Sequence, residues 1–506
     1  MATYYFRNTG DVNWGTATNW SLTDGGGATG AVPTVTDDAV FTNNSGDCTV
    51  NAAGRVCLTL NFATYTNTIT MTNQISVAGN VTLGAGMGIA GAGRLVISTN
   101  NLTLTSNGKT WPNELATGGS AVITITLADD WVIGGTLNLT SSGTTGSSQR
   151  NTFNGFTLSI GGGLTVFTNG NRDVGGTTKF IINGTGSWIA GTSSQVRSSM
   201  DINTTGTFTL ASSTINYAVG TFTYIAGTVV VTGNTFNIDT STTLNTSGMT
   251  WNTIQFQSNV SATLTLTSDL YCVSFIAGGT VGSTQTINNN KVFITGNLVN
   301  GRASATATHT GTTEFHMVGT GTQQFVQQVG QTSTFNCKIV INKPNGTLLI
   351  GNNGLNFRYG TRTIEYLQGT FQTVTPILLI SNCTLLNFNK ALIGSMRIAA
   401  GITVTMNEFF CGSPQSKTTI SSTGANYNIT FEDDFEKIAK FANVSGATIT
   451  RRNQLLMLTD SKKDSTNVGI RYINQSPNGI PKGDPSVQNT LTPGLGSVLV
   501  SDPAFG

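Results

Sequence analysis

Hydrophobic and polar residues alternate in short runs along most of the chain, and the pattern is clearest between Gln74 and Gly108. Apolar residues take every second position in these runs, and glycine or asparagine ends each one: Ile75 and Val77, Val81 and Leu83, Leu95 and Ile97, Leu102 and Leu104. A period of two over a few residues is typical of short strands that bury one face. Because the pattern recurs nearly to the C-terminus, the sequence predicts an all-β fold.

The spacing of these runs indicates how the strands are connected. Turn residues separate the runs from Cys48 to about Ile189, and a looser version continues from Ala190 to Asn300. A turn of a parallel β-helix uses about 20–25 residues, within the range of coiled repeats. Inward Val, Ile, Leu and Phe would then stack on their counterparts, while outward Thr suits a pleated surface. We therefore predict a right-handed parallel β-helix, or β-solenoid, over residues 46–430.

The first 45 residues differ from the repeats that follow. Trp14 and Trp20 lie in the segment VNWGTATNW, ahead of the first regular strands. A stack of coils must close its first turn, because an open end exposes strand edges and core. We therefore predict that residues 1–45 form an N-terminal cap. Asp37 and Asp38, after Pro33, are candidate metal ligands or catalytic acids, but we favour a role in capping this turn through backbone N–H groups.

The pattern changes again near the C-terminus. The segment FEDDFEKIAKFA places Phe431, Phe435, Ile438 and Ala442 at helical spacing, with acidic residues early and lysines later. This predicts a short helix within a C-terminal cap over residues 431–475. Proline then becomes frequent, and proline cannot donate to a strand ladder. Residues 476–506 are therefore predicted to form an extended Pro-rich arm that packs on a neighbouring subunit.

Charge and the N-terminal sequence limit the classes of partner. Charged residues make up 9% of the chain and the net charge is +2, whereas ordinary soluble domains have about 25% charged residues. This gives no electrostatic basis for binding nucleic acid or an anionic membrane. No apolar run approaches the ~18 residues of a membrane-spanning helix. The N-terminus lacks a basic segment followed by an apolar core, so we expect no secretory signal and favour release by lysis or by a dedicated secretion route.

Six cysteines are present, and none of them forms a CxxC pair. Their spacing fits no zinc template. Most lie within strand-like patterns, so we predict that they are buried as small hydrophobic residues. A disulfide between Cys48 and Cys57 is the alternative.

Motifs of nucleotide-binding proteins and hydrolases do not occur in the sequence. Gly86, Gly88 and Gly91 have GxGxxG spacing, but no helical pattern follows them, so a Gly-rich corner is the favoured interpretation. Glu314 and His316 alternate in GTTEFHMVG and are predicted to face the same side of a strand. We favour a solvated strand face over a metal site or an acid–base pair at these two residues.

Cleavage of polysaccharides needs paired carboxylates, so acidic residues that lie close together are candidate catalytic groups. The candidates are Asp129 with Asp130, Glu365, and the cluster Glu432–Asp434. In an extended strand Asp129 and Asp130 would point to opposite faces, and a turn cap explains them as well. We predict no catalytic, cofactor-binding or metal-binding residue.

Aromatic and threonine residues suggest two kinds of binding surface. Exposed aromatic rings on a Thr/Asn-rich face would suit sugar stacking, for which Trp188, Tyr224 and Trp251 are candidates. Core packing is the favoured interpretation for each of the three. Threonine pairs such as Thr103 and Thr105 are typical of ice-binding solenoids, but their spacing along this chain is irregular.

Two segments resemble known proteins. The order NW, Gly-rich loop, VPT and DDAVF near the N-terminus resembles the start of β-helical passenger and fibre proteins of bacteria and their phages. The segment from His309 to Asn352 resembles a recurrent unit of bacterial surface β-helices, through GTTEF, GTGTQ and FNCKIVINKPNGTLLI. This second match covers about 40 residues, in the range of one or two coiled repeats. The resemblance implies an architecture and carries no chemistry.

Together these observations lead us to expect a non-enzymatic virion structural protein. It would be a phage fibre, spike or capsid or tail decoration protein that presents a neutral β-helical rod, made in the host cytoplasm and located on the virion surface. The resemblance implies a homo-oligomer, with a trimer as the expected state, and other virion proteins and a host surface glycan as partners. The alternatives are a bacterial surface adhesin or filament subunit and a tailspike polysaccharide depolymerase.

Overall fold

The computed structural model describes residues 1–118, 122–139, 149–166, 172–191, 194–231, 233–258, 260–279, 282–301, 307–327, 333–350, 357–359, 363–373, 377–379, 382–387, 395–409, 418–432, 436–440, 442–449, 455–459, 467–475 and 481–483. These residues form strands joined by turns and bends, and their single helical element is a 3₁₀ turn, η1 (Ala17–Asn19). The chain divides into two compact units, Met1–Asn252 and Thr253–Gly506, which we call unit 1 and unit 2.

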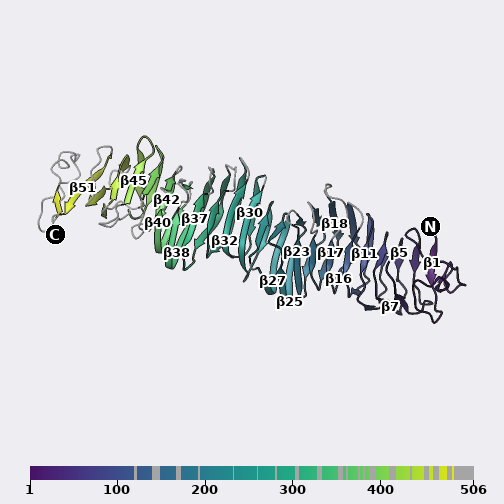
Figure 1. The fold of residues 1–506 in the computed structure, drawn as a ribbon. Helices are drawn as coiled ribbons and strands as arrows, with labels where there is room; N and C mark the ends of the chain where they lie inside the picture. Colours follow the sequence, from purple (N-terminus) through teal and green to yellow (C-terminus); the bar gives the residue numbers. More distant parts are fainter. Residues whose placement is uncertain are drawn as a thin grey trace. The chain divides into compact units, whose positions relative to one another are not determined.

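Unit 1 is a parallel β-helix in which a coil contributes three strands. One coil contains β12 (Leu102–Thr105), β13 (Thr110–Trp111) and β14 (Leu115–Thr117), and the next contains β15 (Val122–Leu127), β16 (Trp131–Ile133) and β17 (Leu137–Leu139). β12 pairs with β15, β13 with β16 and β14 with β17, and all three pairings are parallel. Figure 1 shows the strands of unit 1 side by side along the unit, with β16, β17 and β18 among those labelled. The predicted all-β fold and parallel β-helix are therefore confirmed, whereas the handedness of the coil stays a prediction.

The other coils of unit 1 also stack by parallel pairing, with two or three strands to a coil. Their strands are β3 (Asp38–Val40), β4 (Cys48–Val50), β5 (Arg55–Cys57), β6 (Leu60–Asn61), β7 (Thr68–Met71), β8 (Ile75–Val77), β9 (Val81–Thr82), β10 (Gly88–Gly91), β11 (Leu95–Ile97), β18 (Gln149–Gly155), β19 (Leu158–Ile160), β20 (Leu164–Val166), β21 (Arg172–Gly176), β22 (Phe180–Ile182), β23 (Gly186–Ala190), β24 (Gln195–Arg197), β25 (Met200–Leu210), β26 (Thr214–Tyr217), β27 (Gly220–Val230), β28 (Thr235–Ile238) and β29 (Thr242–Asn245). The coil length varies, because Leu95 pairs with Ile75, 20 residues before it, and Phe153 pairs with Ile125, 28 residues before it.

The core of unit 1 consists of rows of apolar side chains that run from coil to coil. One row is continuous through six coils and contains Ile75, Leu95, Leu115, Leu137, Leu164 and Trp188. Each of these side chains is fully buried. Burying an aliphatic side chain of this size stabilises the fold by about 1.5–3 kcal/mol. The alternation seen between Gln74 and Gly108 is therefore the alternation between this core and the outer surface.

An aromatic cluster closes the first coil of unit 1. β1 (Thr3–Phe6) pairs in parallel with β3 and antiparallel with β2 (Trp20–Ser21). Trp14 and Trp20 are buried, their rings lie 4.8 Å apart, and Trp20 Nε1 donates to the carbonyl of Trp14 at 2.8 Å. Phe6 and Phe41 stack on each other and pack edge-on or tilted against this pair. The two tryptophans are thus packed into this cluster at the first coil, and the N-terminal cap over residues 1–45 stays a prediction.

Unit 2 is also built by parallel pairing, and several of its strands are longer. Its strands are β31 (Ala262–Leu266), β32 (Leu270–Gly279), β33 (Thr284–Asn288), β34 (Lys291–Ile294), β35 (Leu298–Asn300), β36 (Thr308–Met317), β37 (Gln323–Gln327), β38 (Thr334–Ile350), β39 (Phe357–Tyr359), β40 (Thr363–Thr373), β41 (Ile377–Leu379), β42 (Cys383–Leu386), β43 (Ser395–Ile398), β44 (Thr403–Met406), β45 (Thr418–Ser422), β46 (Tyr427–Phe431), β48 (Ala442–Val444) and β49 (Ala447–Ile449); β30 (Thr250–Ser258) contains the boundary between the units. β36 and β38 pair with a register shift between Thr310 and Glu314. Such irregularities bend a strand, so one strand contributes to two faces of the coil.

The predicted C-terminal helix is wrong. β46 ends at Phe431, and the segment that was expected to be helical contains β47 (Glu436–Lys440) and β48. β47 pairs in parallel with β50 (Leu455–Thr459), about one coil later. A helix of three turns is marginal by itself, whereas each strand added to a sheet gains a ladder of hydrogen bonds along its length. Tertiary pairing has therefore overridden the local 3.6-residue pattern.

Part of the predicted Pro-rich arm also belongs to a sheet. β52 (Pro481–Gly483) pairs antiparallel with β51 (Ile470–Gln475) at the edge of a sheet ordered β47-β50-β51-β52. An edge position accommodates proline, because one side of an edge strand needs no N–H donor. The other residues of the arm, 476–480 and 484–506, lie outside the described residues.

Candidate functional site

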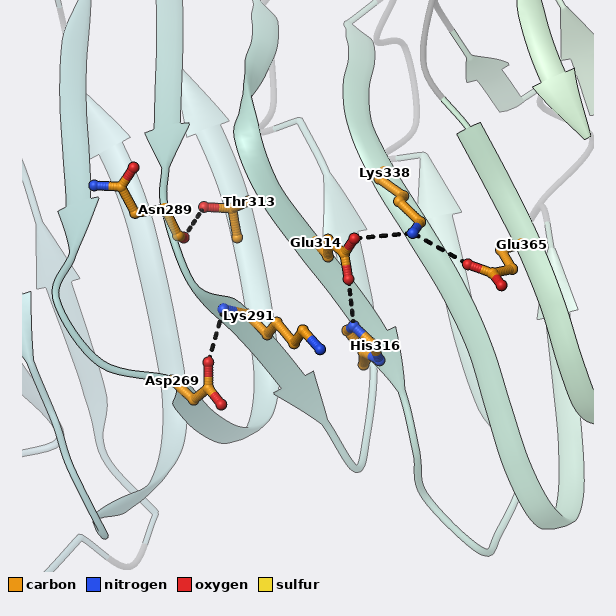
Figure 2. A network of polar contacts seen from close by, with 8 residues as sticks. All are labelled: Asp269, Asn289, Lys291, Thr313, Glu314, His316, Lys338 and Glu365. Atoms are coloured by element: carbon orange, nitrogen blue, oxygen red, sulfur yellow. Dashed lines mark hydrogen bonds and ion pairs between the residues drawn. The ribbon is translucent and has the colours of Figure 1, made fainter. Parts of the chain in front are cut away.

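A network of charged side chains lies on the outer face of unit 2, where β34, β36, β38 and β40 lie side by side (Figure 2). Glu314 Oε2 lies 3.0 Å from His316 Nε2, and Glu314 Oε1 accepts from Lys338 Nζ at 2.9 Å. Lys338 Nζ also lies 3.1 Å from Glu365 Oε2. The predicted juxtaposition of Glu314 and His316 is therefore confirmed, and the structure adds Lys338 and Glu365 to it.

The alternation of the strands places these groups together. In β36, Glu314 and His316 point outward on either side of the buried Phe315, and the parallel register sets Glu314 beside Lys338 of β38. β40 follows, and its Glu365 reaches back to the same lysine. Lys338 was not singled out from the sequence. The strand pattern marks it as outward-facing, but only the register between coils 24 residues apart shows that it meets Glu314.

The ion pairs fix the charge states of the network. Although partial burial opposes ionisation of Glu314, hydrogen bonds from Lys338 and His316 hold its pKa below the usual value. Burial likewise opposes the charged form of Lys338, but hydrogen bonds to Glu314 and Glu365 raise its pKa above the usual value. At neutral pH, Glu314 is thus ionised and cannot donate a proton as a general acid. The geometry favours a cross-link between coils over proton-transfer chemistry.

Two further hydrogen bonds between coils lie beside the network. Asp269 Oδ1 accepts the backbone N–H of Lys291 at 3.0 Å, and Thr313 Oγ1 donates to the carbonyl of Asn289 at 2.6 Å. Figure 2 shows both contacts beside the Glu314 cluster, with the side chain of Lys291 extended along the face. Each contact joins one coil to the next. The whole group therefore ties three or more successive coils together.

The other acidic candidates are occupied by backbone groups. Asp129 accepts the N–H groups of Ser106 and Asn107 at 2.7 and 2.6 Å. Asp130 Oδ1 accepts the hydroxyl of Thr157 at 2.7 Å and its N–H at 3.0 Å, and these bonds lower the pKa of Asp130. Both residues are thus turn caps that join coils, which is the interpretation favoured from the sequence.

Asp37 and Asp38 have similar roles near the N-terminus. Asp37 accepts the N–H of Thr34 at 3.1 Å, its hydroxyl at 2.5 Å and the N–H of Ala2 at 2.8 Å. The hydroxyl of Thr34 makes the largest contribution to the lowered pKa of Asp37. Asp38 instead accepts the hydroxyl of Thr59 at 2.6 Å. Asp37 therefore caps the turn after Pro33, as predicted, whereas Asp38 bonds a threonine of the next coil.

The third acidic candidate is only partly described. Glu432 is exposed at the end of β46. Asp433 and Asp434 lie outside the described residues. Among the residues that the structure covers, there is no group of three or more His, Cys, Asp or Glu side chains placed to hold a metal ion.

The cysteines and the glycine motif are structural. Cys48 and Cys57 are buried free thiols, so the alternative of a disulfide between them is wrong. Cys272, Cys337 and Cys383 are also buried and form no disulfide, while Cys411 lies outside the described residues. Gly88 and Gly91 belong to β10, and a strand, β11, follows them. A dinucleotide fold would require a helix at that point.

The aromatic candidates are mostly in the core. Trp188 and Trp251 are fully buried, which confirms the favoured interpretation for both. Tyr224 is half-buried, and its hydroxyl donates to the carbonyl of Gly227 at 2.6 Å. Tyr271, which was not considered from the sequence, is 41% exposed on the outer face of β32. Its position between the buried Leu270 and Cys272 is the signal that could have identified it.

A histidine and a lysine are buried in the interior of unit 2. His309 is fully buried in β36, where its register neighbours are Gln285 and Phe335, and neither ring nitrogen has a hydrogen-bond partner. Burial lowers its pKa to about 4. Lys343 is also buried, and its Nζ donates to the carbonyl of Gly319 and to Gln323 Oε1, both at 2.5 Å. Burial lowers the pKa of Lys343 to about 8.

Comparisons with protein-family models, curated proteins and solved structures give no match to this chain. In the part of the chain that the structure describes, no helix has the length and apolar character needed to cross a membrane. The function must therefore be argued from the residues of this chain.

Proposed function

We propose that this chain is a non-enzymatic structural protein of a virion: a phage fibre, spike or decoration protein whose β-helical surface serves in host attachment. The proposal rests on the resemblance of the N-terminal and His309–Asn352 segments to β-helical fibre and surface proteins. It extends to a homo-oligomer, with a trimer suggested by the same resemblance, bound to other virion proteins.

The main support for the proposal is that the carboxylates are taken up by hydrogen bonds and ion pairs that hold the fold together. Asp37, Asp129 and Asp130 bond backbone N–H groups, and Glu314 and Glu365 pair with Lys338. Each of these acids holds one coil or turn against another. A carboxylate that is already paired is poorly placed to act as a general acid or a nucleophile. Their arrangement supports a surface that is built for rigidity.

Location is tested by immunogold electron microscopy. Antibodies raised against the purified chain would be applied to phage particles and to uninfected cells from the source culture. The proposal predicts gold on a defined part of the particles. Gold on the surface of uninfected cells would contradict it and would favour an adhesin or a filament subunit.

Activity is tested by incubation of the protein with capsular and lipopolysaccharide glycans. The proposal predicts no new reducing or unsaturated ends. A depolymerase would produce such ends, and their loss in Asp129→Asn, Asp130→Asn, Glu314→Gln or Glu365→Gln would identify the reacting carboxylate. That outcome would overturn the non-enzymatic assignment.

A further inference from the structure

Exposed aromatic and aliphatic side chains form a small apolar patch on the outer face of unit 2. Tyr271 and Val273 are each 41% exposed and occupy alternate positions of β32, so both point outward. Phe293 of β34 is the register neighbour of Tyr271. We call Tyr271, Val273 and Phe293 the aromatic patch. It lies one coil before the charged network of Glu314 and Lys338.

The ring of Tyr271 is held in place by its neighbours. Its centroid lies 4.9 Å from that of Phe293, with an interplanar angle of 10°. Phe293 in turn lies 4.9 Å from the ring of His316, which is bonded to Glu314. The exposed ring is therefore the first of three aromatic rings that pack against one another in the successive strands β32, β34 and β36. A ring that is already ordered loses little conformational entropy when a ligand packs on it.

Polar groups on exposed side chains border the patch. They are the hydroxyl of Tyr271 and the Nζ of Lys291. Lys291 precedes Phe293 by two positions on the same outward face and is exposed. Figure 2 shows its side chain extended along this face. The patch thus combines an apolar ring with a phenol and an ammonium group that can bond hydroxyls.

The charges around the patch indicate the class of ligand. The neighbouring charged side chains are Asp269, Lys291, Glu314, Lys338 and Glu365, which is three anions and two cations. Lys338 already forms ion pairs with both Glu314 and Glu365. This face therefore has no excess positive charge with which to attract a polyanion. An uncharged ligand with an apolar side and several hydroxyls is complementary to it.

We propose that the aromatic patch binds a neutral sugar unit of a glycan, with the C–H face of the sugar on Tyr271 and its hydroxyls on Lys291 Nζ and the Tyr271 phenol. The inference rests on the proposed role in attachment and names the partner that this role requires. It would survive a failure of the virion assignment, because an adhesin could use the same patch.

The test is binding of the full chain to immobilised polysaccharides by biolayer interferometry. The probes are dextran, mannan and galactan as neutral glycans and polygalacturonate as an acidic one. We expect the wild type to bind at least one neutral probe. Tyr271→Ala should bind that probe with at least about tenfold lower affinity. Tyr271→Phe keeps the ring, so its affinity should be closer to that of the wild type. Tyr224→Ala, at a half-buried tyrosine in unit 1, is the matched control and should bind as wild type.

Three outcomes would overturn the proposal. They are binding of none of the neutral probes, binding of polygalacturonate alone, and neutral binding that is equal in Tyr271→Ala and wild type. Equal melting temperatures of the variants and the wild type establish that the surface substitutions leave the fold intact. The particle-labelling experiment is independent of these results, so failure of the sugar site and failure of the virion assignment are distinguishable.

Discussion

The side-chain oxygen of Asn80 accepts the backbone N–H of Thr103 at 2.8 Å, although the two residues are 23 positions apart. Asn100 and Thr124 repeat the contact one coil later at 2.7 Å. Further Asn-to-Thr bonds of the same kind occur in both units: Asn154 with Thr177, Asn288 with Thr312, and Asn382 with Thr403. Asparagine therefore joins successive coils as well as ending strands, which explains its frequency in the turns of this chain.

Replacement of Asn100 by alanine should weaken this junction. The N–H of Thr124 would lose its acceptor, and we expect the free energy of unfolding to fall by about 1 kcal/mol. Chemical denaturation followed by circular dichroism measures the change. Asn43→Ala, at an exposed asparagine, is the control and should change the stability by less than about 0.5 kcal/mol. Equal effects of the two substitutions would show that the Asn–Thr bond contributes nothing specific.

A column of glycines should be intolerant of side chains. Pro112, Gly134, Gly161 and Gly184 follow one another at one corner of unit 1, and a Cβ added to Gly161 would lie 2.8 Å from the carbonyl oxygen of Gly134. At Gly184 the added atom would collide with the carbonyl oxygen of Gly161. We expect Gly184→Ala to destabilise the protein by about 2–3 kcal/mol, because backbone must move to relieve the clash.

Gly27→Ala provides the matched control for this clash. A Cβ at Gly27 would have no neighbour within 4 Å, and its φ is not positive. Its melting temperature should therefore equal that of the wild type. The interpretation fails if Gly184→Ala melts at the same temperature as Gly27→Ala.

Local patterns were sufficient to predict the core but not the contacts between coils. Ile75, Val77, Leu95 and Ile97 could be assigned to the interior because a half-buried strand alternates with a period of two. The network around Lys338 was beyond prediction, since it depends on a register between residues 24 to 27 positions apart, in coils of unequal length. The parallel register is specified by the whole buried row, which no short window contains.

The errors have the same cause. Phe431, Phe435, Ile438 and Ala442 happen to lie at helical spacing, and nothing in that segment reveals its partner β50. The Cys48–Cys57 alternative fails because β4 and β5 belong to separate sheets and both thiols are buried in the core. In both cases the local structure is decided by pairing with residues one coil away, which a short stretch of sequence does not reveal.

Acid should destabilise the protein through His309. Its pKa is about 4 in the folded protein and about 6.5 in the unfolded chain, so the unfolded chain binds the extra proton first as the pH falls. The contribution of the neutral imidazole is complete above pH 6.5 and is lost between about pH 6.5 and 4. The loss is on the order of 3 kcal/mol. Denaturation at pH 7 and pH 4 measures it.

Other groups also titrate between pH 7 and pH 4, so the comparison is between variants. His309→Leu removes the buried imidazole and should lose about 3 kcal/mol less than the wild type over this interval. His316→Gln, at the buried histidine beside Glu314, keeps His309 and should behave more like the wild type. If the free energy of unfolding depended on pH in the same way in the wild type and in His309→Leu, burial of a neutral His309 could not be the cause of the acid destabilisation.

The five described cysteines should be unreactive in the native protein. All are buried, and burial raises the pKa of Cys48, Cys57, Cys272 and Cys383, which keeps these thiols protonated. The thiolate is the reactive form. In a Cys411→Ser background, Ellman's reagent should modify less than one thiol per chain without denaturant and five in guanidinium chloride. Rapid modification of several thiols under native conditions would mean that the core is open to solvent.

The stacking of successive coils is tested most directly by spin labels at outward positions of unit 1. Thr103 pairs with Thr126, and Thr126 pairs with Asn154, so these residues mark three consecutive coils. Adjacent parallel strands lie about 4.8 Å apart. Strong dipolar broadening is therefore expected for labels at Thr103 and Thr126, and weaker broadening for labels at Thr103 and Asn154. The absence of broadening in the first pair, or equal broadening in both pairs, would contradict a parallel β-helix.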